Sequence, residues 1–244
     1  TCLPCMKNES TAAAFIRSRT ALLVEKLDAH ASGMFRSAGA VHLHQVRVTT
    51  RRLRNNLEML ENFFPAAEKE EWNHRIREVG RISSAARDLD VQVRFLRDYG
   101  KRLSDAGERG QIDRLRAAFQ GRRKNLQPRV LASLRQLKDR RTLSSIRACL
   151  ANPSFVKNIP LSVLYRIGYE EILRRVRKLL SFEPDVERPE RIAALHDLRI
   201  ANKRVRYILE YLRPLYGREM DLFLENIVAI HRVLGRMHDD DVWA

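Results

Sequence analysis

The chain has 244 residues, 44% of them hydrophobic, which is enough to bury the core of one large domain or of two fused halves. Its 46 Lys and Arg residues outnumber 30 Asp and Glu residues, so the formal charge is +16 and the expected partner is a polyanion, such as nucleic acid, an anionic membrane surface or another phosphate polymer. No apolar run approaches the roughly 18 to 20 residues of a membrane span, and no signal peptide is evident, so we expect a soluble, cytoplasmic protein.

Helical periodicity dominates the chain, and the ten glycines and eight prolines fall mostly where helices should end. The sequence therefore predicts an all-α protein. The predicted helices span residues 11–37, 42–63, 67–84, 89–104, 110–138, 142–150, 161–181, 189–212 and 218–236. Pro128 lies inside the fifth helix, and we expect it to kink or break that helix because proline has no amide hydrogen to donate.

One basic segment of the second predicted helix recurs in the eighth. Residues 44–60, HQVRVTTRRLRNNLEML, match residues 196–212, HDLRIANKRVRYILEYL, at seven of seventeen positions. The recurring residues include a histidine and several arginines, which packing alone would not require. A duplicated cationic surface indicates an anionic partner.

A second, acidic block is also repeated. Residues 83–91, SSAARDLDV, match residues 234–242, LGRMHDDDV, and the basic and acidic blocks are separated by nearly the same length of chain in both copies. We interpret the acidic blocks as helix starts, where carboxylates suit the helix dipole.

The two repeated blocks predict a single domain over residues 10–244 that is made of two similar halves. We place the halves at about residues 10–109 and 156–244, related by a pseudo-twofold axis and joined by a helical connector at about 110–155. Because the second copy stops just after its acidic block, we expect the second bundle to be incomplete at its C-terminus.

Placed at about 100° per residue, the first basic segment separates into an ionic face and an opposite apolar face. The ionic face carries His44, Arg47, Arg51 and Arg54, and the apolar face carries Val46, Leu53, Leu57 and Leu60. The second segment divides in the same way, with His196, Arg199, Lys203 and Arg206 opposite Leu198, Val205, Leu209 and Leu212. Arg52 and Arg204 flank the ionic faces.

Cations at successive turns of one helix repel one another, so an uncompensated row of them indicates a ligand. If the two helices meet across the pseudo-twofold axis, their ionic faces line one shared groove that suits a linear polyanion. The alternative is a solvated face neutralised by Asp88, Asp90, Asp239 and Asp241. The duplication favours a ligand.

The two histidines head their basic rows, where nearby arginines should lower the imidazole pKa. His44 and His196 either contact the ligand or have a structural role. The composition also allows a metal site formed by these histidines with Asp88, His238 and Asp239, but no close ligand spacing supports it.

We expect no enzymatic activity and no cofactor. The chain has no nucleophile elbow, phosphate loop or glycine-rich dinucleotide turn. Its aspartates could hold Mg²⁺ for phosphate hydrolysis, but no evident base or water-positioning residue accompanies them.

Both repeated blocks resemble those of the CHAD domain, the conserved histidine α-helical domain, over about residues 10–242. The resemblance is carried by His44, Arg47, Arg51, Arg52, Arg54 and residues 87–91, and by His196, Arg199, Lys203, Arg206, Tyr207 and residues 234–239. Ser83 and Ser84 depart from the Leu-Gly that is usual in the family.

The resemblance implies two antiparallel helical bundles and non-catalytic binding of inorganic polyphosphate along a basic central groove. It also implies recruitment to polyphosphate granules, with which some members are linked. Further contacts are expected from Arg81, Arg204, Arg232 and Arg236. The alternatives are a nucleic-acid-binding protein that uses the same surface and a metal-dependent phosphohydrolase.

Overall fold

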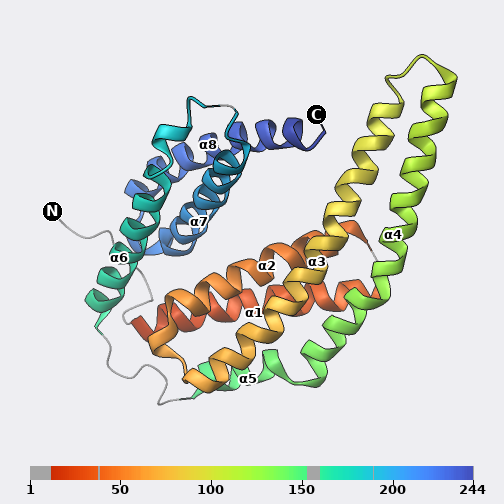
Figure 1. Cartoon of the computed structure of the whole chain (residues 1–244). Helices are drawn as coiled ribbons and strands as arrows, with labels where there is room; N and C mark the ends of the chain where they lie inside the picture. The colour runs from red at the N-terminus through yellow and green to blue at the C-terminus, as the bar shows by residue number, and fades with distance from the viewer. Residues whose placement is uncertain (1–11, 38, 153–159, 189, 244) are drawn as a thin grey trace. The chain divides into compact units, whose positions relative to one another are not determined.

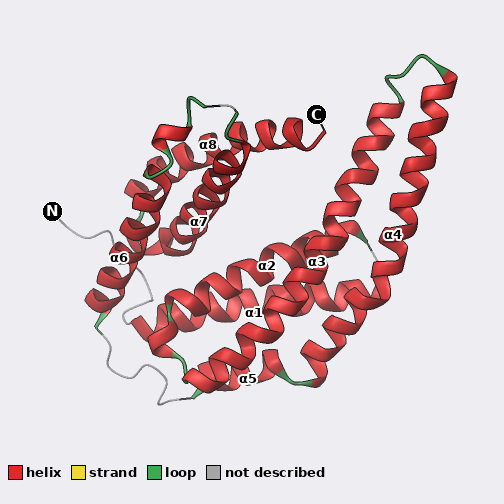
Figure 2. Cartoon of the chain, viewed as in Figure 1, coloured by secondary structure: helices red, strands yellow, loops and turns green. Residues whose placement is uncertain are grey.

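The computed structural model describes residues 12–37, 39–152, 160–188 and 190–243, with side chains described as far as residue 235. Regular structure in these residues is helical throughout, with no strand among them (Figures 1 and 2). The α-helices are α1 (Ala12–Arg36), α2 (Ala40–Met59), α3 (Ala66–Gly100), α4 (Ala106–Asp139), α5 (Thr142–Ala151), α6 (Leu161–Leu180), α7 (Ile192–Tyr216) and α8 (Arg218–Trp243). Two short 3₁₀ helices, η1 (Glu61–Phe63) and η2 (Glu183–Asp185), follow α2 and α6. The all-α prediction is confirmed.

The helices group into two compact units. The N-terminal unit spans Thr20–Phe155, and the C-terminal unit joins the described parts of Thr1–Arg19 and Val156–Ala244. The first eight described residues of α1, 12–19, thus belong to the C-terminal unit, whereas the rest of α1 belongs to the N-terminal unit. The region that we predicted as a connector, about 110–155, forms most of α4 together with α5, and both helices belong to the N-terminal unit.

Apolar residues on one side of α2 anchor it in the N-terminal unit. Val46, Leu53, Leu57 and Leu60 are completely buried, which confirms the apolar face expected from helical periodicity. Thr20 of α1 donates a hydrogen bond to Asn56 Oδ1 at 3.2 Å, and both residues are buried. The opposite side of α2 therefore faces outward from this core.

Trp72 fixes the first turns of α3 against α5. Its side chain is 2% exposed, its ring packs edge-on against Phe64 at 5.9 Å between centroids, and its Nε1 donates to Ser145 Oγ at 3.2 Å. An indole of this size dominates local packing, and its buried N–H requires a partner. This contact holds α5 in the unit.

Helix α3 is one continuous helix of 35 residues where the sequence predicts two, so the predicted break near residues 85–88 is wrong. Ser83 and Ala86 are completely buried, and their small side chains allow the neighbouring helices to approach. Ala86 also favours a helix, so packing and local propensity act together here. Asp88 and Asp90 consequently lie within a helix and not at a helix start. Asp90 Oδ1 instead accepts a hydrogen bond from Arg123 Nε of α4 at 2.8 Å.

Helix α4 is also continuous and runs through Pro128, so of the two expected outcomes, a kink or a break, the break does not occur. Val130, Leu134 and Leu137, which follow the proline, are at most 2% exposed. Their burial compensates for the hydrogen bond that proline cannot make. Helices α3 and α4 lie side by side along much of their length, and α4 changes direction along its course (Figure 1).

The C-terminal unit is built around α7. Leu198, Val205, Leu209 and Leu212 are at most 7% exposed, which confirms the second apolar face. Gly168 allows α6 to approach α7 closely, because a Cβ at this position would lie 3.0 Å from Leu212 Cδ1. Phe15 of α1 packs edge-on against Tyr211 at 5.6 Å between centroids.

Helix α7 extends past its predicted end at residue 212 and includes Pro214. It ends at Gly217, whose φ of 64° suits glycine because this residue has no Cβ to clash with the backbone.

Candidate anion-binding surfaces

The ionic side of α2 presents its cations at the surface of the N-terminal unit. His44, Arg47, Arg51, Arg52 and Arg54 are all partly exposed. Since the apolar side of the same helix is completely buried, the core fixes the direction in which these side chains point.

Helix α3 adds cations beside this row. Arg47 Nε donates to Ser84 Oγ of α3 at 3.2 Å, which ties the two helices together at their ionic sides. Arg87 of α3 lies close enough to His44, and Arg77 close enough to Arg54, to change the pKa of each. We call this surface the α2–α3 basic face, and its residues are His44, Arg47, Arg51, Arg54, Arg77 and Arg87.

Sequence reasoning did not assign Arg77 and Arg87 to the site. It divided α3 into two helices at about residues 85–88 and read Arg87 only as part of an acidic helix start. A continuous helix over residues 66–100 would have placed both arginines beside α2, but the burial that makes α3 continuous is a tertiary effect.

The α2–α3 basic face holds an excess of positive charge. Burial lowers the pKa of Arg54, and the neighbouring Arg77 and Arg51 lower it further, while Glu58 acts in the opposite direction. Arg54 and Arg77 form no ion pair with any described residue. A lowered arginine pKa means that the surroundings disfavour the charge, and a bound anion would remove that penalty.

His44 has the lowered pKa that the sequence predicts. Burial is the largest cause, and the positive charges of Arg87, Arg47 and Arg51 add to it. Its Nδ1 atom is buried and has no hydrogen-bond partner among the described residues. The neutral imidazole therefore prevails near neutral pH in the absence of a ligand.

The second basic segment lies on α7. His196, Arg199, Lys203, Arg206 and Tyr207 are partly exposed, and Arg204 is exposed. We call His196, Arg199, Lys203 and Arg206 the α7 basic face. Arg206 Nε donates to Glu210 Oε1 at 2.7 Å, so one cation of this face is paired within its own helix.

A buried arginine of α6 donates a hydrogen bond to the backbone of α7. Arg175 is 6% exposed, and its Nη1 donates to the carbonyl oxygen of Arg204 at 3.2 Å. Its Nε donates to Glu171 Oε2, also at 3.2 Å. This network uses a guanidinium to position the α7 backbone.

The remaining predicted contact residues are spread over other helices. Arg81 is exposed on α3, and Arg232 is exposed on α8. The side chain of Arg236 lies outside the described residues, as do those of His238, Asp239 and Asp241.

Among the residues with described side chains, no group of three or more His, Cys, Asp or Glu residues is arranged to hold a metal ion. Cys149 is partly exposed, and burial followed by the charge of Glu68 raises the pKa of its thiol, which disfavours the reactive thiolate. A helix long and apolar enough to cross a membrane is also absent from the part of the chain that the structure describes.

The fold has a counterpart among solved structures. The CHAD domain from the plant Ricinus communis matches with a TM-score of 0.73 and 21% sequence identity, over 96% of this chain and 77% of that chain. No curated protein matches. The CHAD domain family model matches residues 19–244, with both basic helices inside the matched region. The chain therefore belongs to the CHAD domain family, which is associated with the binding of polyphosphate.

Proposed function

We propose that this chain binds inorganic polyphosphate without hydrolysing it, through the α2–α3 basic face and through the α7 basic face. The observation that carries the proposal is the crowding of like charge around Arg54, whose pKa is lowered by burial, Arg77 and Arg51. Crowded guanidinium groups are costly unless an anion accompanies them. Membership of the CHAD family supports polyphosphate as that anion.

The spacing of the arginines suits a repeating anion. Arg47, Arg51 and Arg54 follow one another at intervals of four and three residues on α2, which are rises of roughly 6 and 4.5 Å. Each planar guanidinium can donate two hydrogen bonds to phosphate oxygens. A row of this kind favours a linear polymer over a single phosphate.

Binding without catalysis is also part of the proposal. Asp90, one of the aspartates that could have held Mg²⁺, already accepts a hydrogen bond from Arg123 at 2.8 Å. The shared groove and the pseudo-twofold relation inferred from the repeat stay predictions. We further propose that binding recruits the protein to cytoplasmic granules rich in polyphosphate.

The test compares matched charge reversals. Arg51→Glu with Arg54→Glu should lower the affinity for long-chain polyphosphate about 100-fold, measured by fluorescence anisotropy at physiological salt, while helicity is preserved. The control is Arg114→Glu with Arg129→Glu, since these exposed residues of α4 lie outside the basic faces and the charge change is the same. Equal losses in both variants would refute the assigned surface.

Two further measurements separate the alternatives. Polyphosphate should displace labelled duplex DNA and RNA from the protein, and the reverse competition should be inefficient. Incubation of polyphosphate with the protein and Mg²⁺ should release no phosphate. Preferential binding of nucleic acid, or steady phosphate release that is lost on Asp88→Asn, would favour the corresponding alternative function.

A further inference from the structure

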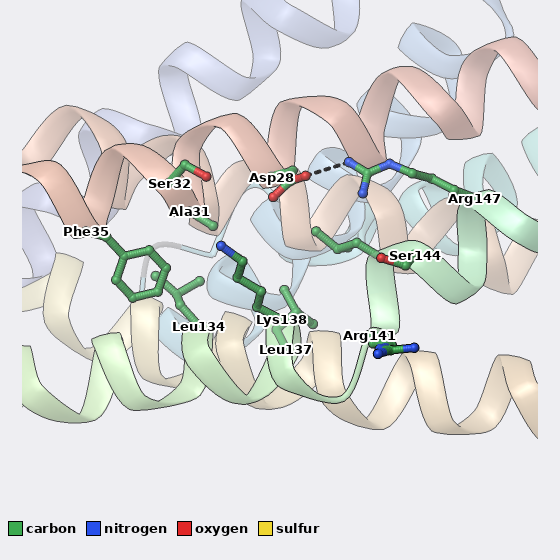
Figure 3. Close-up of a pocket in the computed structure, with 11 residues that line it drawn as sticks. Asp28, Ala31, Ser32, Phe35, Leu134, Leu137, Lys138, Arg141, Ser144 and Arg147 are labelled. Atoms are coloured by element: carbon green, nitrogen blue, oxygen red, sulfur yellow. Dashed lines mark hydrogen bonds and ion pairs between the residues drawn. The ribbon is translucent and has the colours of Figure 1, made fainter.

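A small cavity lies in the N-terminal unit between α1, the end of α4 and the start of α5 (Figure 3). Its volume is about 100 Å³, and none of its lining residues belongs to either basic face. Ligand pockets for drug-sized molecules measure roughly 300–1,000 Å³, so this cavity suits a much smaller ligand.

One wall of the cavity is apolar. Leu134 and Leu137 of α4 form its floor and are almost completely buried, whereas the Phe35 ring of α1 is 39% exposed beside them. The guanidinium of Arg135 lies over the Phe35 ring, 5.8 Å from its centroid, which limits the positions that the ring can adopt. An exposed ring above a buried aliphatic floor offers a surface for a compact apolar group.

The other wall carries hydrogen-bond donors and positive charge. Lys138 extends from α4 toward Ser32 of α1, and Ser144 lies across the cavity on α5 (Figure 3). Arg141 lines the end where α4 gives way to α5. Neither Lys138 nor Arg141 forms an ion pair with a described residue, so two positive charges and two hydroxyl groups line the cavity.

The acidic residue of the lining is already paired. Arg147 donates to Asp28 Oδ2 at 2.6 Å and to Glu25 Oε1 at 2.8 Å. The hydrogen bond to Glu25 is the largest cause of the raised pKa of Arg147, and the hydrogen bond to Asp28 is the second. Arg147 is shared by two carboxylates, so this cluster keeps one negative charge, and Lys138 with Arg141 leaves a net positive charge around the cavity.

We propose that this cavity binds a phosphate monoester that carries a compact apolar group. A phosphate monoester has nearly two negative charges and three terminal oxygens near neutral pH, which match two cations and two hydroxyl donors. A carboxylate would leave one of the cations unpaired. The apolar group lies against Phe35, and the Leu134 and Leu137 side chains support it from beneath.

The test uses phenyl phosphate as the probe, with inorganic phosphate and benzoate at matched ionic strength. Isothermal titration of the full chain should give saturable binding of one phenyl phosphate in the millimolar range, about tenfold tighter than inorganic phosphate because part of the ring leaves water against Phe35. Benzoate should bind more weakly than phenyl phosphate. Equal affinity for phenyl phosphate and inorganic phosphate would overturn the proposal.

Matched variants locate the binding. Lys138→Gln should weaken phenyl phosphate binding about tenfold. Lys124→Gln removes the same charge from an exposed position of α4 away from the cavity and should leave binding unchanged. Phe35→Ala should remove the preference for phenyl phosphate over inorganic phosphate. Helical circular dichroism checks the folding of each variant.

Polyphosphate affinity separates this site from the proposed function. Lys138→Gln should leave polyphosphate binding intact, and Arg51→Glu with Arg54→Glu should leave phenyl phosphate binding intact. Phenyl phosphate binding that is abolished in the α2 variant and retained in Lys138→Gln would overturn the cavity assignment.

Discussion

The two copies of the repeated basic helix lie in different surroundings. On α2, the neighbouring helix α3 adds Arg77 and Arg87, and the positive charges there contribute to the lowered pKa of Arg54 and His44. On α7, Arg206 is paired with Glu210 at 2.7 Å. Similar sequence motifs therefore produce unequal electrostatic surfaces, because α3 adds cations beside α2, whereas one cation of α7 is paired within its own helix. We infer that the α2–α3 basic face is the stronger anion site.

The first prediction tests this inequality directly. Arg51→Glu with Arg54→Glu should lower the affinity for long-chain polyphosphate about 100-fold, since two charge-assisted contacts become repulsive. Lys203→Glu with Arg206→Glu should lower it only about tenfold, because Glu210 already offsets part of the charge on α7. Fluorescence anisotropy at one fixed salt concentration measures both values.

The comparison requires that both double variants fold equally well. Helicity and thermal midpoint should be the same in the two double variants, so that neither loss of affinity reflects unfolding. An equal or larger loss in the α7 variant would reverse the ranking of the two faces.

The second prediction concerns the support beneath α7. Arg175→Ala removes a buried guanidinium that bonds to Glu171 and to the Arg204 carbonyl, and should lower the free energy of unfolding by about 2 kcal/mol. Denaturant titration followed by circular dichroism measures the change. Arg166→Ala, at an exposed position of the same helix, is the matched control and should change stability by less than about 0.5 kcal/mol. A stability change no larger than that of the control would mean that the hydrogen bonds of Arg175 do not stabilise α7.

The burial of one side of each basic helix was predictable from the sequence pattern. A period of 3.6 residues correctly separated the apolar and ionic sides of α2 and α7, because one side of each helix must be buried. Val46 and Leu53 on α2, and Val205 and Leu209 on α7, are all completely buried.

The features that sequence reasoning missed depend on contacts between helices. Ser83 is a weak helix former and Asp88 looks like part of a helix start, but α3 continues through both, with Ser83 completely buried. Pro128 allows either a kink or a break, and the buried residues after it hold α4 together. Arg87 joins the site only because α3 passes beside α2. None of these contacts leaves a local signal, so a single sequence could not predict them.

The third prediction uses salt to count the cations at each face. In a plot of log affinity against log salt concentration, Arg51→Gln with Arg54→Gln should make the slope less negative by about 1.4. Each cation that binds a phosphate contributes roughly 0.7 to this slope. The same change at Lys203 and Arg206 should make it less negative by about 0.7, because Arg206 is paired with Glu210. Affinities measured between about 50 and about 300 mM salt give the slopes. Identical changes in slope would show that both faces contribute equally to counterion release.

The smallest effect concerns protonation of His44 at the stronger face. In the free protein, burial and the charges of Arg87, Arg47 and Arg51 lower its pKa below the ordinary value of 6.5. Bound phosphate oxygens favour the imidazolium, so the pKa rises on binding and the complex takes up protons. Polyphosphate affinity should therefore increase as pH falls from about 7.5 to about 6, by about threefold for one titrating group.

Substitution of His44 isolates this contribution. His44→Gln cannot take up a proton and should flatten the dependence of affinity on pH, whereas His74→Gln, at an exposed position of α3 outside the basic face, should leave it unchanged. A dependence that persists in His44→Gln would assign the proton uptake to another group. It would also mean that His44 does not contact the bound anion.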